Sequence, residues 1–434
     1  MSDWIKRFFS LLLFFVFFTP AGFTIDRATA LLIEKEIKKH INEIIKIRRF
    51  LHMNPELSNR EYETSKLITS KLMSLGIEVK SGIAGTGVSG LLEGNHEGFT
   101  LGLRADMDAL PIQEETHLPY TSLNPGVMHA CGHDIHMSIA LGTAIVLNNL
   151  KDKIKGKIKF IFQPAEEGPP KGEEGGASLM VKEGVLKEPP VMAIFGQHVW
   201  PSIEVGQILF SSGPIMASSD TVEIIIKGKS SHGARPYEGI DAITLAAHTI
   251  VSIQSFMDRM IDPSDPAIVS IGKIYGGGRS NIIADSVTLE GTVRTLTRTN
   301  RTKIETMLEN IVKGITHPFG ANYTFNYQKG APPVYNHPGL GDIMLPVLQE
   351  AVGKDNVLPL QPQMVAEDFS IFSQKIPGFY FFLGVKPPGQ KTMPPLHSPF
   401  FNPDERSIAL GIKIACYLLL DCLASQDSFG SNLY

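Results

Sequence analysis

A cluster of metal-binding side chains separates a predicted strand from a predicted helix in the first third of the chain. Residues 129–136 read His-Ala-Cys-Gly-His-Asp-Ile-His, so three histidines, a thiol and a carboxylate occur within eight residues. The apolar run 101–105 leads to Asp106 and Asp108, and the run 137–147 is typical of a helix. Open α/β sheets carry their functional groups at such strand-to-helix loops. The pattern therefore predicts an α/β domain with its chemistry at this junction.

The residue types of the cluster limit the chemistry that it supports. Thiolate, imidazole and carboxylate groups together suit Zn²⁺ or another divalent ion of the first transition row. A solvated, histidine-rich turn is the alternative. A lone histidine is usually structural, but a dense group of Cys, His and Asp usually belongs to a functional site. The cluster therefore predicts a metal site.

Further candidate groups follow later predicted strands: Glu166 and Glu167 after strand 157–162, His198 near the end of strand 191–201, and His397 on a loop. Two adjacent glutamates most often form a solvated acidic turn, and a histidine at a strand end is more often structural than a ligand. Here Pro164 and Gly168 fix the turn, and a metal cluster occurs nearby in the sequence. The carboxylate pair is therefore a functional candidate.

Composition describes an ordinary globular chain without a nucleic-acid partner. The 434 residues allow two or three domains and a large core. Charged residues make up 19% and the net charge is −4, with no long basic run. Cys416 and Cys422 lie in one apolar helical run, too far apart along it to form a disulfide. We expect them to be buried, and no disulfide framework is indicated.

The first 29 residues differ from the rest. Lys6 and Arg7 precede the apolar run 8–18, and small residues follow around Ala21. This order of basic, apolar and small-residue parts is typical of a secretory signal, and the run is short for a membrane span. We therefore expect export to the periplasm or the medium. An uncleaved N-terminal membrane anchor is the alternative.

A second domain is predicted inside the first. Residues 221–327 show the order β-α-β-β-α-β, which is that of a ferredoxin-like unit. We assign 217–332 to this satellite domain, and 30–216 and 333–434 to the two parts of a catalytic domain. The predicted fold class is α/β, with a mixed sheet flanked by helices in the catalytic domain. One catalytic-domain helix is predicted over 58–75.

Seven sequence blocks carry a resemblance to a known family: Arg49-Phe-Leu-His-Met-Asn-Pro-Glu-Leu, Arg104-Ala-Asp-Met-Asp-Ala-Leu-Pro, His129-Ala-Cys-Gly-His-Asp, Phe162-Gln-Pro-Ala-Glu-Glu, Ser231-His-Gly-Ala, Glu367-Asp-Phe and Leu396-His-Ser-Pro. Together they resemble the metal-dependent amidohydrolase and peptidase family that includes aminoacylase and carboxypeptidase G. The resemblance is greatest to the branch of hippurate hydrolase, bacterial N-acyl-amino-acid amidohydrolases and plant auxin-conjugate hydrolases. It covers residues 41–420.

The resemblance implies a site for two divalent ions, zinc or manganese, with nickel or cobalt as alternatives. The ligands that it implies are Cys131, His133, Glu167, His198 and His397. It implies Glu166 as the general base and Asp108 as an acid that supports a ligand. Asp106 stands where relatives outside this branch carry a histidine ligand, so its role is left open.

The resemblance also implies a homodimer. In relatives the satellite domain pairs two subunits, and its loop histidine, here His232, reaches the partner's active site. Asn281 and Arg294 match positions that bind the substrate carboxylate. The chain departs from the family pattern at Ala284, where proline is usual, and at 335–337; these departures bear on substrate recognition and not on the implied ligands.

The implied activity is metal-assisted hydrolysis of an amide bond. The expected substrates are N-acyl amino acids with acetyl, benzoyl or arylacetyl groups, cleaved to a carboxylic acid and a free amino acid. A carboxypeptidase or dipeptidase of the same family is the alternative. A catalytically silent metal-binding or dimeric interaction protein is disfavoured, because all of the implied ligands and Glu166 are present.

Overall fold

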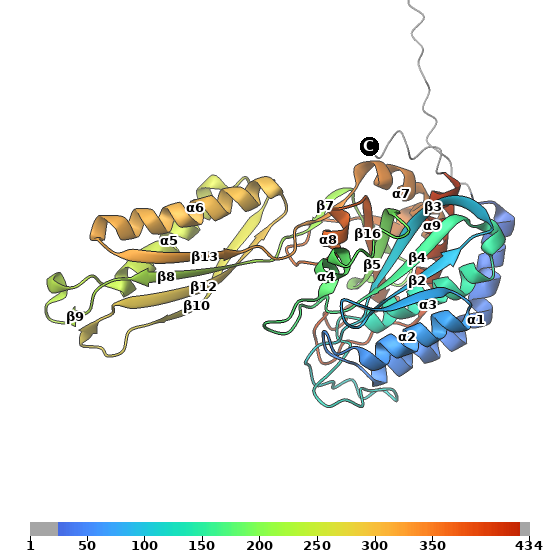
Figure 1. The fold of residues 1–434 in the computed structure, drawn as a ribbon, viewed down its shortest axis with the longest axis horizontal. Coiled ribbons are helices and arrows are strands. Elements are labelled where there is room, and N and C mark those ends of the chain that lie inside the picture. The colour runs from blue at the N-terminus through green and yellow to red at the C-terminus, as the bar shows by residue number, and fades with distance from the viewer. Residues whose placement is uncertain (1–24, 426–434) are drawn as a thin grey trace, which may run out of the picture.

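The computed structural model describes residues 25–425, which form two lobes in an elongated molecule (Figure 1). Residues 1–24 of the predicted export segment, 1–29, lie outside the described residues. The larger lobe contains both the N-terminal and the C-terminal parts of the described chain, and the smaller lobe is formed by a continuous segment between them. The smaller lobe is therefore an insertion in the larger one.

The larger lobe is built on an eight-stranded mixed sheet in the order β1-β2-β4-β3-β5-β16-β6-β15. Its strands are β1 (Glu78–Ile83), β2 (Gly87–Glu93), β3 (His96–Asp106), β4 (Lys155–Gln163), β5 (Val191–Glu204), β6 (Ile208–Phe210), β15 (Val357–Pro359) and β16 (Gly378–Lys386). The four central strands β4, β3, β5 and β16 run parallel. Buried parallel strands need apolar side chains on both faces, which explains the continuous apolar runs in the sequence.

Helices cover both faces of this sheet. One face packs against α1 (Arg27–Met53), α2 (Tyr62–Ser74), α3 (His133–Asn148), α7 (Pro338–Val352) and α9 (Arg406–Ala424). The other packs against the short helices α4 (Gly176–Lys182) and α8 (Phe369–Ser373). Among the described residues, only α9 is long and apolar enough to cross a membrane, and 78% of its apolar window is buried. The apolar run is thus a core helix, and Cys416 and Cys422 are free and buried in it, as predicted.

Helix α2 begins later than the sequence predicted. The expected helix covered 58–75, but the structure has it from Tyr62 to Ser74. The preceding residues make contacts that a helix would prevent: the Ser58 hydroxyl donates to Asp108 Oδ2 at 2.7 Å, and Asn59 has a φ of 62°. Tertiary hydrogen bonds therefore override the local helical pattern here.

The smaller lobe has the predicted ferredoxin-like topology. It comprises β8 (Asp220–Lys227), α5 (Ala242–Met260), β10 (Ala267–Gly276), β12 (Ser286–Thr295), α6 (Arg298–Thr316) and β13 (Asn322–Gln328), which lie within the predicted range 217–332. Its antiparallel sheet has the order β10-β12-β8-β13. A separate core, which includes Ile224, Leu289 and Leu308, holds the sheet against the two helices.

Two small strand pairs mark the ends of the smaller lobe. The chain enters through β7 (Gly213–Met216) and leaves through β14 (Val334–Asn336), and these two strands pair with each other. The pair of β9 (Ser231–His232) and β11 (Ile282–Ile283) connects two loops, and Figure 1 shows β9 at the outer tip, far from the larger lobe. The β9–β11 pair is therefore a two-stranded sheet of its own and not part of the four-stranded sheet of the smaller lobe.

A buried charged network ties α1 to the start of α3. Arg48 Nε lies 2.9 Å from Asp134 Oδ2, and His52 Nδ1 lies 2.7 Å from the same oxygen. All three side chains are fully buried. Removing one partner from such a network leaves the others buried without their counter-charge.

We expect Asp134→Ala to lower the free energy of unfolding by about 3–5 kcal/mol, the usual cost of breaking a buried ion pair from one side. Urea denaturation measures this. Glu63→Ala is the matched control, because it removes an exposed pair with Lys66 at 2.6 Å; it should cost less than about 1 kcal/mol. Equal effects of the two substitutions would contradict the structural role of the buried network.

Candidate metal centre

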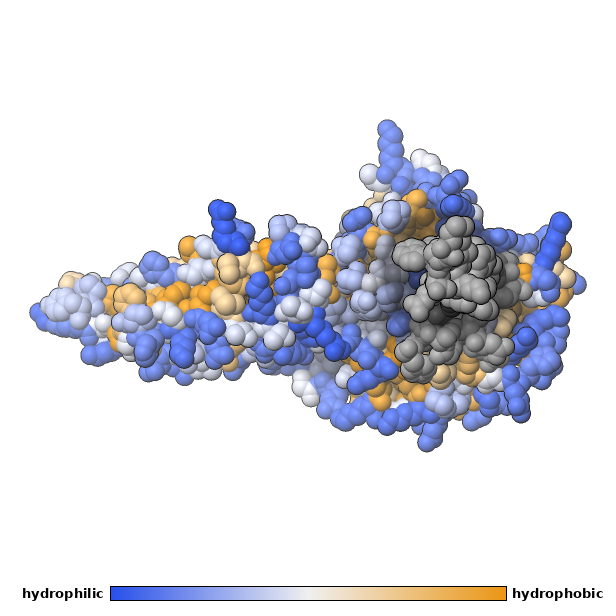
Figure 2. Space-filling model, turned by 90° about the horizontal axis from the view of Figure 1, so that it is seen from above, coloured by the Kyte–Doolittle hydropathy of each residue, from blue (hydrophilic) through white to orange (hydrophobic). Residues whose placement is uncertain are grey.

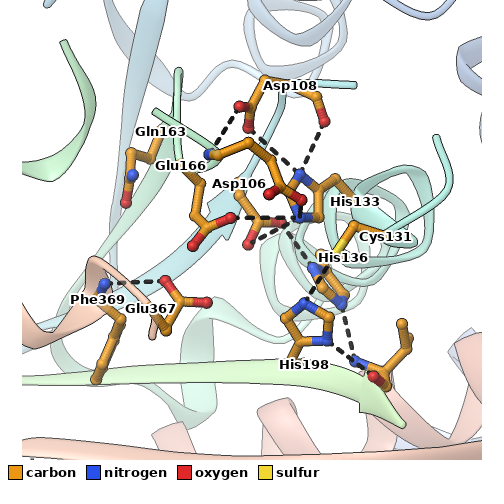
Figure 3. A network of polar contacts seen from close by, with 12 residues as sticks. Asp106, Asp108, Cys131, His133, His136, Gln163, Glu166, His198, Glu367 and Phe369 are labelled. Atoms are coloured by element: carbon orange, nitrogen blue, oxygen red, sulfur yellow. Dashed lines mark hydrogen bonds and ion pairs between the residues drawn. The ribbon is translucent and has the colours of Figure 1, made fainter. Parts of the chain in front are cut away.

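The candidate site lies at the carboxyl ends of the central parallel strands. Glu166 and Glu167 follow β4, His198 lies on β5, and Cys131 and His133 flank the start of α3. Figure 3 shows that several of these side chains converge from different elements. Parallel strands end at one edge of the sheet, so groups distant in the sequence meet there.

Gly132 makes the turn between Cys131 and His133. Its φ is +84°, a left-handed conformation that L side chains rarely adopt. A Cβ at this position would lie 2.5 Å from Val199 Cγ2. Only glycine fits the turn, and the turn allows the thiol and the imidazole on its two sides to point into one site.

The predicted ligand atoms lie at metal-ligand spacing. Cys131 Sγ is 3.3 Å from Nε2 of both His198 and His397. Glu167 Oε1 is 3.2 Å from His397 Nε2 and 4.0 Å from His133 Nε2. Atoms bound at about 2.0–2.3 Å to one tetrahedral ion lie roughly 3.3–3.8 Å apart. Two groups of three donors, Cys131 with His133 and His198, and Cys131 with Glu167 and His397, share the thiol.

Asp108 orients two of these ligands. His133 Nδ1 lies 2.8 Å from the Asp108 carbonyl oxygen and 3.3 Å from Oδ1, which leaves Nε2 turned toward the other donors. Oδ2 of Asp108 accepts hydrogen bonds from the Glu167 N–H at 3.0 Å and the Ser58 hydroxyl at 2.7 Å. Such contacts behind the ligands fix their orientation and tautomer. Asp108 therefore contacts two of the predicted ligands, and the supporting role that the family resemblance implies for it stays a prediction.

The donor set fits a divalent ion. His133 Nε2 and Glu167 Oε1 are buried, and neither has a hydrogen-bond partner among the described residues. Buried polar atoms rarely lack partners, because leaving them unsatisfied costs free energy. A thiolate, three imidazoles and a carboxylate with lone pairs directed at a common space suit metal ions of the kind predicted.

The two other histidines of the cluster have different environments. His136 Nδ1 contacts Asp106 Oδ1 at 2.6 Å, and His136 Nε2 accepts the Val199 N–H at 2.9 Å. Both ring nitrogens are therefore occupied, and His136 is no free ligand although it lies close to His133. His129 is buried, and it belongs to none of the donor groups found among residues 25–425. Spacing in the sequence could not separate these histidines from His133.

Arg104 is a site residue that sequence reasoning missed. This fully buried guanidinium donates to Asp106 Oδ2 at 2.6 Å, to Glu367 Oε1 at 2.8 Å and to Gln163 Oε1 at 2.8 Å. Asp106, whose role was left open, therefore neutralises Arg104 and holds His136 in place. The sequence signal was present, because Arg104 and Glu367 both lie in the family blocks, but nothing in the sequence showed that they pair.

Glu166 lies beside the donor atoms of His133 and Glu167. Its Oε2 is 3.8 Å from His133 Nε2, and Figure 3 shows it between His133 and Glu367. Burial raises the pKa of Glu166, and the carboxylates of Glu367 and Glu167 raise it further. A carboxylate with raised proton affinity next to a metal site is suited to receive a proton from water.

Two cavities meet at Glu166 and Glu167. One of about 240 Å³ is lined by apolar side chains, including Trp200, Met216 and Leu396, and also by four of the predicted ligands: Cys131, Glu167, His198 and His397. The other, of about 840 Å³, includes Arg294, Lys329 and Ser219 from the smaller lobe. The carboxylate pair therefore faces both a small cavity that contains the donor cluster and an apolar wall, and a larger cavity in which Arg294 and Lys329 occur together with acidic side chains.

The three predicted site residues of the smaller lobe do not lie together. Arg294 and Glu166 line the same larger cavity, and the Arg294 guanidinium donates to the Ser218 carbonyl oxygen at 3.4 Å. His232 and Asn281 lie at the outer tip, where the Gly233 N–H donates to the Asn281 carbonyl at 2.7 Å. Asn281 and Arg294 were predicted to act on one carboxylate, but within a single chain the fold separates them.

Comparisons with known proteins place the chain in a family. The chain matches the family described as Peptidase family M20/M25/M40 over residues 102–421. It is 40% identical to thermostable carboxypeptidase 2 from Saccharolobus solfataricus, with 87% of this chain and 95% of that protein covered. It is 42% identical to an N-acyl-L-amino acid amidohydrolase from Geobacillus stearothermophilus, with 70% and 82% covered. It is 37% identical to N-acetyl-L-cysteine deacetylase from Bacillus subtilis, with 89% of each covered.

A solved structure shows the same fold. It is a dinuclear metal-binding peptidase of the M20 family from Bacillus subtilis, with a TM-score of 0.76 and 35% identity over 89% of this chain and 99% of that one. A metal-binding cluster at the carboxyl edge of the sheet, together with an inserted ferredoxin-like lobe, defines a metal-dependent hydrolase. The chain belongs to peptidase family M20/M25/M40, which confirms the predicted resemblance and fold class.

Proposed function

We propose that this protein hydrolyses the amide bond of N-acyl amino acids with two divalent ions bound. The observation that carries the proposal is the position of Glu166 at the border of the two cavities. An acyl group would lie against the apolar wall of the smaller cavity, and the carboxylate of the amino acid would pair with the Arg294 guanidinium in the other. The amide bond would then lie beside Glu166 and the donor cluster. Relatives named as an amidohydrolase and a deacetylase support this proposal.

The side chains of the site have distinct tasks in this reaction. When bound, the two ions would polarise the scissile carbonyl and lower the pKa of the attacking water. Glu166 accepts the proton of that water and passes it to the leaving amine. Asp108 holds His133 and Glu167 at the required orientation through the contacts described above. The thiol of Cys131 favours zinc, and manganese is the main alternative.

An assay of amine release tests the proposal. The metal-loaded protein is given N-acetyl, N-benzoyl and indole-acetyl derivatives of one amino acid, and dipeptides with the same C-terminal residue. We expect faster turnover of the N-acyl amino acids, with kcat/KM reduced when the free carboxylate is replaced by an amide. Turnover of dipeptides alone would favour the carboxypeptidase activity named for one relative.

We also propose a homodimer formed through the smaller lobe. Its edge strand β10 and helix α5 expose large apolar side chains: Ile268, Ile274, Tyr275, Ile243 and Val251. Figure 2 shows hydrophobic residues along the length of this lobe. An unpaired strand edge with exposed apolar groups suits pairing with a second copy. His232 lies too far out to serve its own chain in this arrangement, so a two-fold pair would bring it to the partner's site.

His232 is prepared to donate a hydrogen bond in such a dimer. Its Nδ1 accepts the Ala234 N–H at 3.0 Å, so the ring proton is on Nε2 when the imidazole is neutral. An Nε2–H group can stabilise the oxyanion that develops on the scissile carbonyl.

Mixing two inactive variants tests this arrangement. His232→Ala and Glu166→Gln are each expected to be nearly inactive. After subunit exchange, each heterodimer contains one site with an intact Glu166 and an intact partner histidine, so activity should return. The heterodimer fraction is measured by mass spectrometry. Heterodimers without recovered activity would show that His232 does not act across the interface.

The N-terminal segment supports a further proposal, on location. Because its basic, apolar and small-residue parts follow one another as in a secretory signal, we propose that the protein is exported. An uncleaved membrane anchor is the alternative, and N-terminal sequencing of the mature protein distinguishes the two.

A further inference from the structure

A buried carboxylate outside the metal site supports the turn that carries the general base. Glu61 precedes helix α2 and is fully buried. Its Oε1 accepts the Ala165 N–H at 2.9 Å, and its Oε2 accepts the Thr86 hydroxyl at 2.6 Å. Glu61 contacts none of the predicted ligands, and no step of the reaction uses it.

The turn needs this support because of its backbone conformation. Ala165, the residue before Glu166, has a φ of 51°, in the left-handed region that residues with a Cβ seldom occupy. Such a conformation persists only where the surroundings enforce it. The other end of the turn is held independently, because the Glu167 N–H donates to Asp108 at 3.0 Å. The contact with Glu61 therefore acts on the end that orients Glu166.

We propose that Glu61 is a positioning residue for catalysis, which holds Ala165 in its strained conformation and thereby directs the Glu166 carboxylate at the attacking water. This inference rests on the proposed role of Glu166 as the general base. Misplacing a reacting group by about 1 Å costs about 10²-fold in rate. Loss of the contact should therefore lower kcat, while substrate binding and metal binding change little.

Two conservative variants separate the hydrogen bond from the charge. Glu61→Gln keeps an acceptor oxygen at the same reach, and its amide group can donate to Thr86. Glu61→Asp keeps the carboxylate but is one methylene shorter, so it cannot reach both partners. Burial raises the pKa of Glu61 to about 7, so a neutral side chain is compatible with this site.

The chain offers a matched control. Glu183 Oε2 accepts the Ala84 N–H at 2.7 Å, and Ala84 also has a φ of 51°. This contact has the same donor and acceptor groups, a glutamate that holds a left-handed alanine, but Glu183 is exposed where Glu61 is buried, and it lies outside the donor cluster and the two cavities that meet at Glu166. Glu183→Asp therefore reports the general cost of losing such a bond.

The experiment measures kcat, KM, metal content and amide hydrogen exchange of the turn for all three variants. Glu61→Asp should lower kcat by roughly 10- to 100-fold with KM and metal content near wild type, and the Ala165 N–H should exchange faster. Glu61→Gln and Glu183→Asp should stay within about threefold of wild-type kcat.

Several results would overturn the proposal. A wild-type kcat in Glu61→Asp is the first. An equal loss of kcat in Glu61→Gln is the second, because it would assign the effect to the charge. An equal loss of kcat in Glu183→Asp is the third. If the wild-type protein turns over no N-acyl amino acid, the proposed function fails. Hydrogen exchange at Ala165 still tests the contact in that case, because it needs no substrate, and unchanged exchange in Glu61→Asp would overturn it.

Discussion

Cys131→Ala is expected to prevent the protein from binding its full complement of two metal ions and to reduce turnover by about 10³-fold or more. The thiol is the donor shared by both groups of candidate ligands, and it lies 3.3 Å from two imidazoles. Its loss should weaken binding of both ions. Several kcal/mol of transition-state stabilisation depend on the metal, and each 1.4 kcal/mol is about tenfold in rate. Elemental analysis of the purified protein and the amine-release assay measure the two effects.

The control for this substitution is Cys416→Ala. Cys416 is also a buried free thiol, but it lies in the core helix α9 and belongs to no donor group of the described chain. Its replacement should leave metal content unchanged and cost only some stability, because a small cavity forms in the core. Unchanged metal content in Cys131→Ala would remove Cys131 from the ligand set.

Glu166→Gln is expected to retain both ions and to lower kcat by roughly 10²–10⁴-fold. The amide keeps the shape of the side chain but cannot accept a proton from water. Metal binding should persist, because Glu166 is not among the predicted ligands. Metal analysis together with steady-state kinetics measures this combination of results.

The neighbouring residue provides the comparison. Glu167→Gln is the same chemical change one residue later, at the carboxylate whose Oε1 lies 3.2 Å from His397 Nε2. It should lower the metal content, which Glu166→Gln should not. If instead Glu166→Gln loses metal, while Glu167→Gln retains metal and loses turnover, the two roles are exchanged, and Glu167 is the base.

Most secondary-structure elements and the family could be predicted from patterns within the chain. The spacing of apolar residues predicted most helices and strands, since a buried helix or strand must repeat its apolar positions. The order β-α-β-β-α-β predicted the inserted lobe, which the topology confirms. The cluster at 129–136 predicted a metal site from residue chemistry alone, because few other arrangements require thiol, imidazole and carboxylate groups together.

The tertiary structure decided what each polar group contacts. His133 and His136 are three residues apart and chemically identical, yet one has a free ring nitrogen and the other has none. Arg104 and Glu367 are 263 residues apart and form a buried pair. These contacts depend on which strands lie side by side in the folded sheet.

The sequence by itself determined the fold class, the family and the chemical kind of site, because these follow from local patterns and residue types. Only the tertiary structure decided the contacts of Glu61 and the pairing of Arg104, and only it placed His232 at the outer tip of the smaller lobe. The start of α2 shows the reason. Its local pattern favoured a helix from residue 58, but side-chain hydrogen bonds to distant segments replaced the first turn. Long-range contacts of this kind leave no periodic signal in the sequence.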